Sequence, residues 1–192
     1  MEIAFCLYDG LTALDFVGAF DPITRLRTMG YREDIDWDIC AHTETATATG
    51  NLTFTIDRID PDLGEYDMVF MPGGIETRTL IDDEAFVDWV RTAGHCEWKV
   101  SVCTGSLLYG AAGLLEGKAA TTHPSAFERL KAYCEVRDER VVEDSDVITA
   151  RGVSSSVDLG LYVVEKLADA EIRAEIQSQM DYPYGGEVFT DR

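Results

Sequence analysis

The fold is decided by the stretch Trp98-Lys99-Val100-Ser101-Val102-Cys103-Thr104-Gly105-Ser106-Leu107-Leu108, in which an apolar strand runs into a helix. A reactive side chain at such a turn is pushed out of the sheet edge and held over the helix N-terminus, as in a nucleophile elbow. The reactive atom here is the sulfur of Cys103, and the small residues Ser101 and Gly105 allow strand and helix to approach closely. Unpaired N–H groups and positive partial charge at the helix N-terminus favour a thiolate. A buried core cysteine explains the local pattern equally well.

Outside this stretch the chain alternates predicted strands with predicted helices. Strands are predicted at 3–8, 37–41, 52–56, 68–71, 100–102, 118–121, 141–142 and 147–150. Helices are predicted at 11–29, with a kink or restart at Asp21-Pro22, and at 83–92, 105–112, 124–133, 154–167 and 170–180. This order predicts an α/β fold, with a mostly parallel sheet covered by helices on both faces.

Length and composition indicate one domain over residues 1–192, with an irregular tail over 181–192. With 192 residues, of which 46% are hydrophobic, the chain is long enough to bury a large core. Its apolar runs are too short to span a membrane. The first residues, Met1-Glu2-Ile3-Ala4-Phe5-Cys6, already resemble a strand, so we expect no secretory signal.

The cysteines and histidines predict no disulfide framework and no metal site. The five cysteines are scattered and contain no C-x-x-C pair, a pattern typical of reduced thiols in a cytosol. The three histidines, His42, His95 and His123, form no metal-ligand pattern.

The net charge of −20 is extreme, with 36 acidic residues against 16 basic ones. The acids are spread along the whole chain, and only four of the basic residues are lysine. A distributed acidic shell with little lysine fits a protein that works in concentrated salt, where self-repulsion is screened. We therefore expect a cytoplasmic protein of a high-salt cytosol, the alternative being an ordinary acidic protein. The same charge argues against nucleic-acid binding, which needs a basic face.

Three groups of residues fall at the carboxyl ends of predicted strands, where parallel sheets bind their ligands. The segment 9–15 follows the first strand, Gly73-Gly74 follows the strand at 68–71, and Cys103 follows the strand at 100–102. We expect these groups to meet at one edge of the sheet.

Four motifs together resemble the ThiJ/PfpI superfamily, which is related to class I glutamine amidotransferases. They are Met-Pro-Gly-Gly (71–74), Ser-Val-Cys-Thr-Gly-Ser (101–106), Gly-Ala-Ala-Gly-Leu-Leu-Glu-Gly-Lys (110–118) and Ala-Thr-Thr-His-Pro (120–124). The resemblance runs from Met1 to about Asp181 and implies a flavodoxin-like three-layer sandwich. The Val-Cys-Thr-Gly elbow and the acid at Asp15 are most similar to the isocyanide hydratase branch and to sensor domains of related AraC-type regulators.

The resemblance implies that Cys103 is the nucleophile and Asp15 the acid that contacts its sulfur. Such a carboxyl works if it is protonated and donates a hydrogen bond to the thiolate, because two adjacent negative charges raise one pKa. A helix N-cap is the alternative role for Asp15. The N–H groups of Gly74 and Thr104 would form an oxyanion hole, and Gly73-Gly74 would allow close approach and positive φ. A tight turn at the strand end is the alternative for the two glycines, and both roles are compatible.

The same resemblance gives further candidates around the pocket. Thr104 replaces the His that follows the Cys in the intracellular-protease branch, and its hydroxyl would position a substrate atom or water. His123 matches the Thr-His-Pro position and is weighed against a structural histidine. Gly152 and Val153 would border the pocket, or form a turn before the helix at 154–167. Glutaminase chemistry is disfavoured, because no His with an acidic partner follows far downstream.

The implied function is hydration of an isocyanide, a lyase reaction that proceeds through a thioimidate on Cys103 and needs no cofactor or metal. The alternatives are glyoxalase- or deglycase-type chemistry on reactive carbonyls, and a non-catalytic oxidation sensor or ligand-binding domain. The expected partners are a small electrophile and a second copy of the chain, because homodimers are the superfamily habit. A free-standing DNA-binding regulator is not expected, because the charge is unsuitable and no length remains for a helix-turn-helix domain.

The acidic shell predicts that salt stabilises the fold. We expect the midpoint of thermal unfolding to rise on going from dilute buffer to molar KCl, because screening removes self-repulsion among the 36 acidic side chains. Differential scanning calorimetry over a KCl series checks this, and a midpoint that stays level or falls would contradict it.

Overall fold

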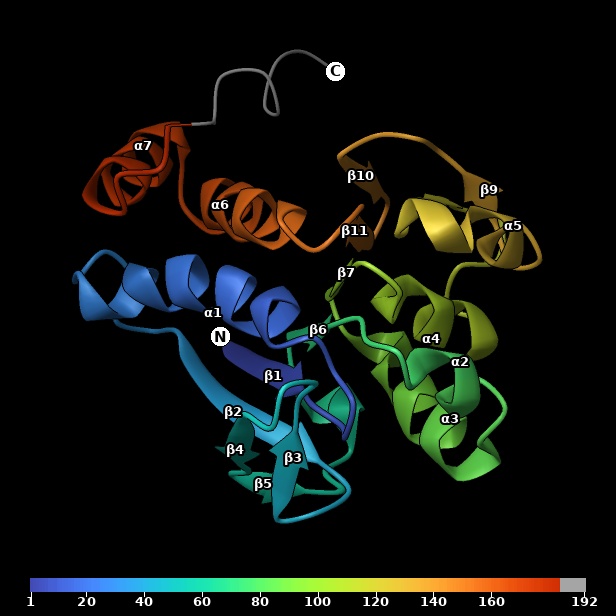
Figure 1. Ribbon diagram of the computed structural model, residues 1–192. Helices are drawn as coiled ribbons and strands as arrows, with labels where there is room; N and C mark the ends of the chain where they lie inside the picture. Colours follow the sequence, from blue (N-terminus) through green and yellow to red (C-terminus); the bar gives the residue numbers. More distant parts are fainter. Residues whose placement is uncertain (184–192) are drawn as a thin grey trace.

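The computed structural model describes residues 1–183, and its centre is one mostly parallel sheet (Figure 1). The sheet has seven strands in the order β10-β11-β7-β6-β1-β2-β5. These strands are β1 (Glu2–Cys6), β2 (Asp36–Ala41), β5 (Arg58–Ile59), β6 (Met68–Met71), β7 (Trp98–Val102), β10 (Val141–Asp144) and β11 (Val147–Ala150). Only β10 runs antiparallel to its neighbour, because a short turn joins it to β11.

The remaining strands form two small sheets that are separate from the main sheet. One is the antiparallel hairpin of β3 (Thr45–Thr47) and β4 (Thr53–Thr55), and the other is the parallel pair of β8 (Ala119–Ala120) and β9 (Glu135–Val136).

Helices cover the sheet on two sides, which confirms the predicted three-layer α/β class (Figure 1). The α-helices are α1 (Ala13–Thr28), α2 (Thr77–Leu80), α3 (Glu84–Arg91), α4 (Gly105–Ala111), α5 (Phe127–Leu130), α6 (Ser155–Leu167) and α7 (Ala170–Gln179). Short 3-10 turns occupy Leu63–Glu65, Thr92–His95 and Pro124–Ala126. Helices α1, α6 and α7 lie together on one side of the sheet, and α3 and α4 lie on the other. No helix within residues 1–183 is long and apolar enough to cross a membrane.

The strands of the sheet core lie where the apolar runs predicted them, and the differences fall at the periphery. The short elements β3, β5, β9 and α2 were not predicted, because each is shorter than the periods that reveal a strand or helix. The predicted helix at 124–133 is instead a 3-10 turn followed by the four residues of α5. The irregular tail was predicted over residues 181–192. Residues 181–183 form no helix or strand, and residues 184–192 lie outside the described residues.

The predicted restart at Asp21-Pro22 is wrong, because α1 continues through Pro22. Helix α1 packs against α6 at this proline. A Cβ on Gly160 of α6 would lie 2.3 Å from Cγ of Pro22 and 2.9 Å from the carbonyl oxygen of Ala19, so the two helices meet where Gly160 has no side chain. Ser156 of α6 also donates a hydrogen bond of 3.0 Å to the carbonyl of Leu14. These contacts hold α1, and with it Asp15, in a fixed position over the sheet.

Gly160→Ala tests this packing. The added methyl group would overlap the ring of Pro22, so we expect the free energy of unfolding to fall by about 1–3 kcal/mol. Gly94→Ala is the matched control, because its added Cβ would meet nothing closer than 3.6 Å. Urea unfolding of both variants measures the difference, and an equal effect of the two substitutions would contradict the packing argument.

Candidate active site

Cys103 lies on a strained turn between β7 and α4, as the sequence predicted. Its φ of 55° is in the left-handed region, which a non-glycine residue rarely adopts. Its N–H donates to the carbonyl of Ala150 at 3.0 Å, and its carbonyl accepts from the Thr122 hydroxyl at 2.8 Å and the Ser106 hydroxyl at 3.3 Å. These bonds hold the backbone in the strained conformation. Cys103 is only 6% exposed and belongs to the buried core, as the core-cysteine alternative expected, and it also lines a cavity, as a nucleophile must.

Gly105 makes the elbow possible because α4 begins against the end of β6. A Cβ at this position would lie 2.3 Å from the carbonyl oxygen of Met71 and 2.8 Å from that of Pro72. Any larger residue would push the helix away from the strand and displace Cys103. The sequence prediction that a small residue allows this approach is therefore confirmed at Gly105.

Gly73 and Gly74 form the opposite wall of the site. The N–H of Thr12 donates to the carbonyl of Gly73 at 2.9 Å, and Leu11 pairs with Gly74 as an isolated β-bridge. A Cβ on Gly73 would lie 2.7 Å from Cβ of Cys103, and one on Gly74 would lie 2.5 Å from the carbonyl oxygen of Gly10. Neither glycine has positive φ, so lack of space and not backbone freedom requires them, which corrects the expected positive φ.

Asp15 reaches the site from the first turn of α1. It does not cap the helix, because Thr12 occupies the N-cap position, so the N-cap alternative is wrong. The side chain is fully buried, and one carboxyl oxygen lies 2.8 Å from the position that a Cβ on Gly73 would take. Although Cys103 is adjacent, neither carboxyl oxygen forms a hydrogen bond of regular geometry within residues 1–183. A carboxylate so poorly solvated is costly, so protonation is favoured.

The thiol and the carboxyl therefore titrate as one unit. Burial raises the pKa of Asp15 to about 7, although the adjacent Cys103 thiol and the Gly73 N–H oppose the shift. Burial and then the Asp15 charge raise the pKa of Cys103 to about 12, although the N–H and hydroxyl of Thr104 oppose this. The helix N-terminus thus favours the thiolate as predicted, but burial outweighs it. Between about pH 7 and 12 the pair holds one proton and one negative charge, mainly with the proton on Cys103 and the charge on Asp15, and the thiolate beside a protonated Asp15 is the minor arrangement.

Thr104 joins the two walls of the site. Its hydroxyl accepts a hydrogen bond from the N–H of Gly74 at 3.1 Å and donates one to the Gly74 carbonyl at 3.1 Å. The structure therefore differs from the expectation of a free Gly74 donor, because that N–H already has an acceptor. The Thr104 N–H faces the sulfur, where it lowers the pKa of Cys103. Of the two predicted oxyanion donors, the Thr104 N–H lies beside the sulfur of Cys103, and the Gly74 N–H is bonded to the Thr104 hydroxyl.

His123 combines the structural and the functional role weighed from the sequence. Its Nδ1 accepts from the N–H of Ser125 at 3.2 Å and lies 2.8 Å from the Ser125 hydroxyl, so the ring caps a 3-10 turn. The ring also lines the cavity of Cys103, as Val153 does. Gly152 lies behind the ring, because a Cβ there would meet Cδ2 of His123 at 3.5 Å. The structure thus places all three residues at or beside the pocket.

The cavity over Cys103 has a volume of about 250 Å³ and brings in residues that sequence reasoning missed. These additional lining residues are Thr12, Thr49, Ile75, Arg78 and Ser125. Thr12 and Arg78 follow strands β1 and β6, so their position after a strand end was the available signal. Thr49 comes from the loop beyond β3, which no sequence pattern connects with this edge. The site brings together a buried thiol, an adjacent buried carboxyl and several hydroxyl groups.

Known proteins resemble this chain both in sequence and in structure. The sequence model described as the DJ-1/PfpI family matches residues 1–166. Isonitrile hydratase of Pseudomonas putida is 30% identical over 185 residues, which cover 95% of this chain and 78% of that protein. Protein DJ-1alpha of Drosophila melanogaster is 32% identical over 124 residues, covering 63% of this chain and 57% of that protein. A ThiJ/PfpI family protein from Pseudomonas syringae superposes with a TM-score of 0.84 at 29% identity, covering 95% of this chain and 75% of that one.

The variant Asp15→Asn tests whether Asp15 is protonated in the folded protein, through the pH dependence of the free energy of unfolding. Because the pKa of Asp15 rises from 3.8 in the unfolded chain to about 7, its proton stabilises the fold fully below pH 3.8, and this contribution is lost as the pH rises through 7. An Asn side chain cannot ionise, so the stability of the variant does not fall in this pH range for that reason. On going from about pH 4 to pH 8, the free energy of unfolding of wild type should fall by roughly 3–4 kcal/mol relative to the variant.

Urea unfolding over a pH series measures this difference. The exposed Asp82→Asn is the matched control and should run parallel to wild type over the whole range. If the Asp15→Asn curve also runs parallel to wild type, the carboxyl is ionised throughout and the shared proton does not exist.

Proposed function

The chain belongs to the DJ-1/PfpI family, and on this premise we propose that it is a cysteine-dependent hydratase of small electrophiles, of the isonitrile (isocyanide) hydratase type. The observation that carries the proposal is the pairing of Cys103 with Asp15. A strained elbow presents the sulfur, and a fully buried carboxyl with a pKa of about 7 lies beside it. Hydration of an isocyanide requires these two functions together, a nucleophile for carbon and an acid for that same carbon.

The first step forms the bond between sulfur and carbon. The Cys103 thiolate, formed when Asp15 holds the shared proton, adds its electron pair to the terminal carbon of the isocyanide. The negative charge that develops on this carbon is removed when Asp15 donates its proton to it. The product of the step is a neutral thioimidate on the sulfur, and Asp15 is left as a carboxylate.

The second step consumes water. The Asp15 carboxylate accepts a proton from a water molecule as its oxygen adds to the thioimidate carbon. Asp15 passes this proton to the nitrogen of the adduct. The carbon–sulfur bond then breaks and its electron pair returns to Cys103, while the hydroxyl proton of the adduct passes to Asp15, so that an N-substituted formamide leaves and the starting pair is restored. The Thr104 N–H, beside the sulfur, supports the charge on sulfur in both steps. The net change is the addition of one water to the isocyanide.

The environment of the pair fits this sequence of proton transfers. A carboxyl with a pKa of about 7 is both a usable acid and a usable base near neutral pH. The hydroxyl groups of Thr12, Thr49 and Ser125 line the cavity and are suited to hold the attacking water.

We further propose that the protein acts as a homodimer in a high-salt cytosol. On α1, Leu14 and Val17 lie one turn apart and are 47% and 37% exposed, and Ile75 near the cavity is 55% exposed. Exposed apolar side chains of this kind favour contact with a second copy. The charge of −20 supports the high-salt setting.

Turnover of an alkyl isocyanide to a formamide, followed by chromatography, tests the function. We expect wild type to be active, Cys103→Ala to be inactive, and Asp15→Asn to lose about 10²–10⁴-fold in rate, the usual contribution of a general acid. Cys134→Ala is the matched control, because this partly exposed thiol lies outside the cavity and its loss should leave the rate unchanged.

Other outcomes would assign the site differently. An inactive wild type would remove the hydratase proposal. Methylglyoxal turnover that disappears in Cys103→Ala would instead assign carbonyl chemistry to the same pair. If both assays fail, peroxide treatment followed by intact mass tests the oxidation-sensor alternative, which requires oxygen to be added at Cys103.

A further inference from the structure

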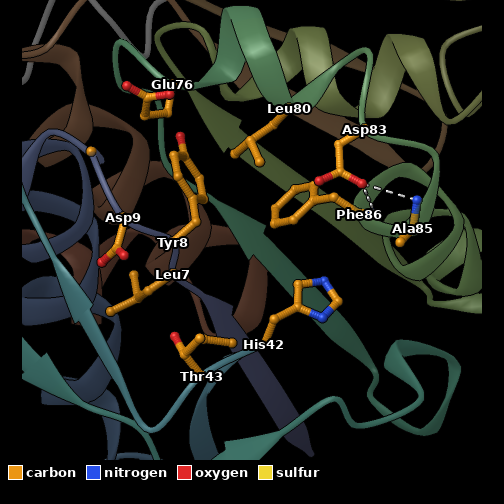
Figure 2. Close-up of a pocket in the computed structure, with 12 residues that line it drawn as sticks. Leu7, Tyr8, Asp9, His42, Thr43, Glu76, Leu80, Asp83, Ala85 and Phe86 are labelled. Carbon is orange, nitrogen blue, oxygen red and sulfur yellow. Dashed lines mark hydrogen bonds between the residues drawn. The ribbon is translucent and has the colours of Figure 1, made fainter.

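A second cavity lies at the same edge of the sheet, at the ends of β1 and β2. Its volume is about 450 Å³, larger than the cavity over Cys103, and the two share no lining residue. Its walls are formed by Leu7, Tyr8, Asp9, Gly10, Ala41, His42, Thr43, Glu76, Leu80, Asp83, Ala85 and Phe86 (Figure 2). We call it the aromatic cavity. Binding pockets for small molecules commonly have volumes of about 300–1,000 Å³.

Aromatic rings from helix α3 and from the segments that follow β1 and β2 line this cavity. The rings of Tyr8 and Phe86 meet edge to face with centroids 5.8 Å apart, and the ring of His42 lies 5.3 Å from that of Phe86. Figure 2 shows these rings around one space, with Leu80 above and Leu7 beside Tyr8. The rings are held by the fold, because Tyr8 donates to the carbonyl of Pro72 at 2.7 Å and His42 contacts the carboxylate of Asp60. Rigid rings around an apolar space bind the apolar body of a ligand.

The charged groups at the aromatic cavity are carboxylates. Asp9 is held by the N–H of Thr47 at 2.8 Å, and Asp83 is held by the N–H of Ala85 at 3.1 Å, each through one oxygen. Within residues 1–183, the Glu76 carboxylate has neither an ion pair nor a hydrogen bond, and Figure 2 places it above the Tyr8 hydroxyl. No Lys or Arg is among the described residues that line this space. The cavity therefore attracts a cation and repels an anion.

Aromatic faces and carboxylates together select one class of ligand. An aromatic ring attracts a cation through its quadrupole, and organic ammonium ions are the ligands that such rings commonly recognise. We propose that the aromatic cavity binds a small organic ammonium ion, with its apolar body against Tyr8 and Phe86 and its charge toward Glu76. The proposal is independent of the reaction at Cys103, because the cavity has its own walls and its own charges.

Calorimetric titration with three probes of one shape tests the proposal. The probes are phenethylammonium, neutral 2-phenylethanol and anionic phenylacetate, each titrated into the wild-type protein in molar KCl to suppress non-specific attraction. We expect the ammonium probe to bind about tenfold more tightly than the alcohol, because of the cation–π and carboxylate contacts, and phenylacetate not to bind. Equal binding of all three probes, or no binding of the ammonium probe, would overturn the proposal.

Variants locate the binding in the aromatic cavity. Glu76→Gln should remove most of the preference for the ammonium probe over the alcohol while the alcohol still binds, because only the charge is lost. Ala85→Trp should abolish binding of both probes, because Ala85 is exposed at the start of α3 and a larger side chain there fills the space.

The net charge does not change in Ala85→Trp, so general attraction to an acidic protein would survive this substitution. Ala170→Trp places the same side chain at the exposed start of α7 and should bind like wild type. Circular dichroism verifies that each variant is folded. If Ala85→Trp binds phenethylammonium as wild type does, the ligand lies elsewhere and the assignment is wrong.

Discussion

The central constraint in this molecule is the burial of a carboxyl group against a thiol. Asp15 is fully buried beside Cys103, and only one of the two groups carries a charge near neutral pH. In the proposed hydratase reaction, the proton that this pair holds has to lie on Asp15 for the sulfur to attack as a thiolate and for the carboxyl to act as an acid. This arrangement costs stability above neutral pH, so the rest of the structure must hold the pair in place.

The Asp15–Cys103 pair is held in place by close approaches between neighbouring backbone segments. Gly105 lets α4 begin against the end of β6, Gly73 leaves room between Asp15 and Cys103, and Gly160 lets α1 settle on α6. Each of these contacts fixes one side of the pair. Thr104 then joins the elbow to the Gly74 turn through a donated and an accepted hydrogen bond. The site is therefore a consequence of packing at glycines, and its strain at Cys103 is held by hydrogen bonds to neighbouring strands and loops.

The carboxyl edge of the sheet carries two cavities of different character. The cavity over Cys103 is rimmed by hydroxyl groups, His123 and Arg78, whereas the aromatic cavity is lined by rings and carboxylates. Tyr8 links them, because its ring lines the aromatic cavity while its hydroxyl donates to Pro72, directly before the Gly73-Gly74 turn. The two cavities thus differ in the ligands that they attract, although a single edge of the sheet forms both.

The sequence by itself determined the α/β order, the elbow at Cys103 and the place of Asp15 and Gly73-Gly74 at strand ends, because strand periodicity and local motifs act over a few residues. Only the tertiary structure decided the burial that raises the two pKa values of the pair, the occupied N–H of Gly74, the continuation of α1 through Pro22 and the aromatic cavity. Each of these depends on atoms that lie far apart in the chain. Burial and electrostatic energy are set by distance in space, and a linear pattern does not contain that distance.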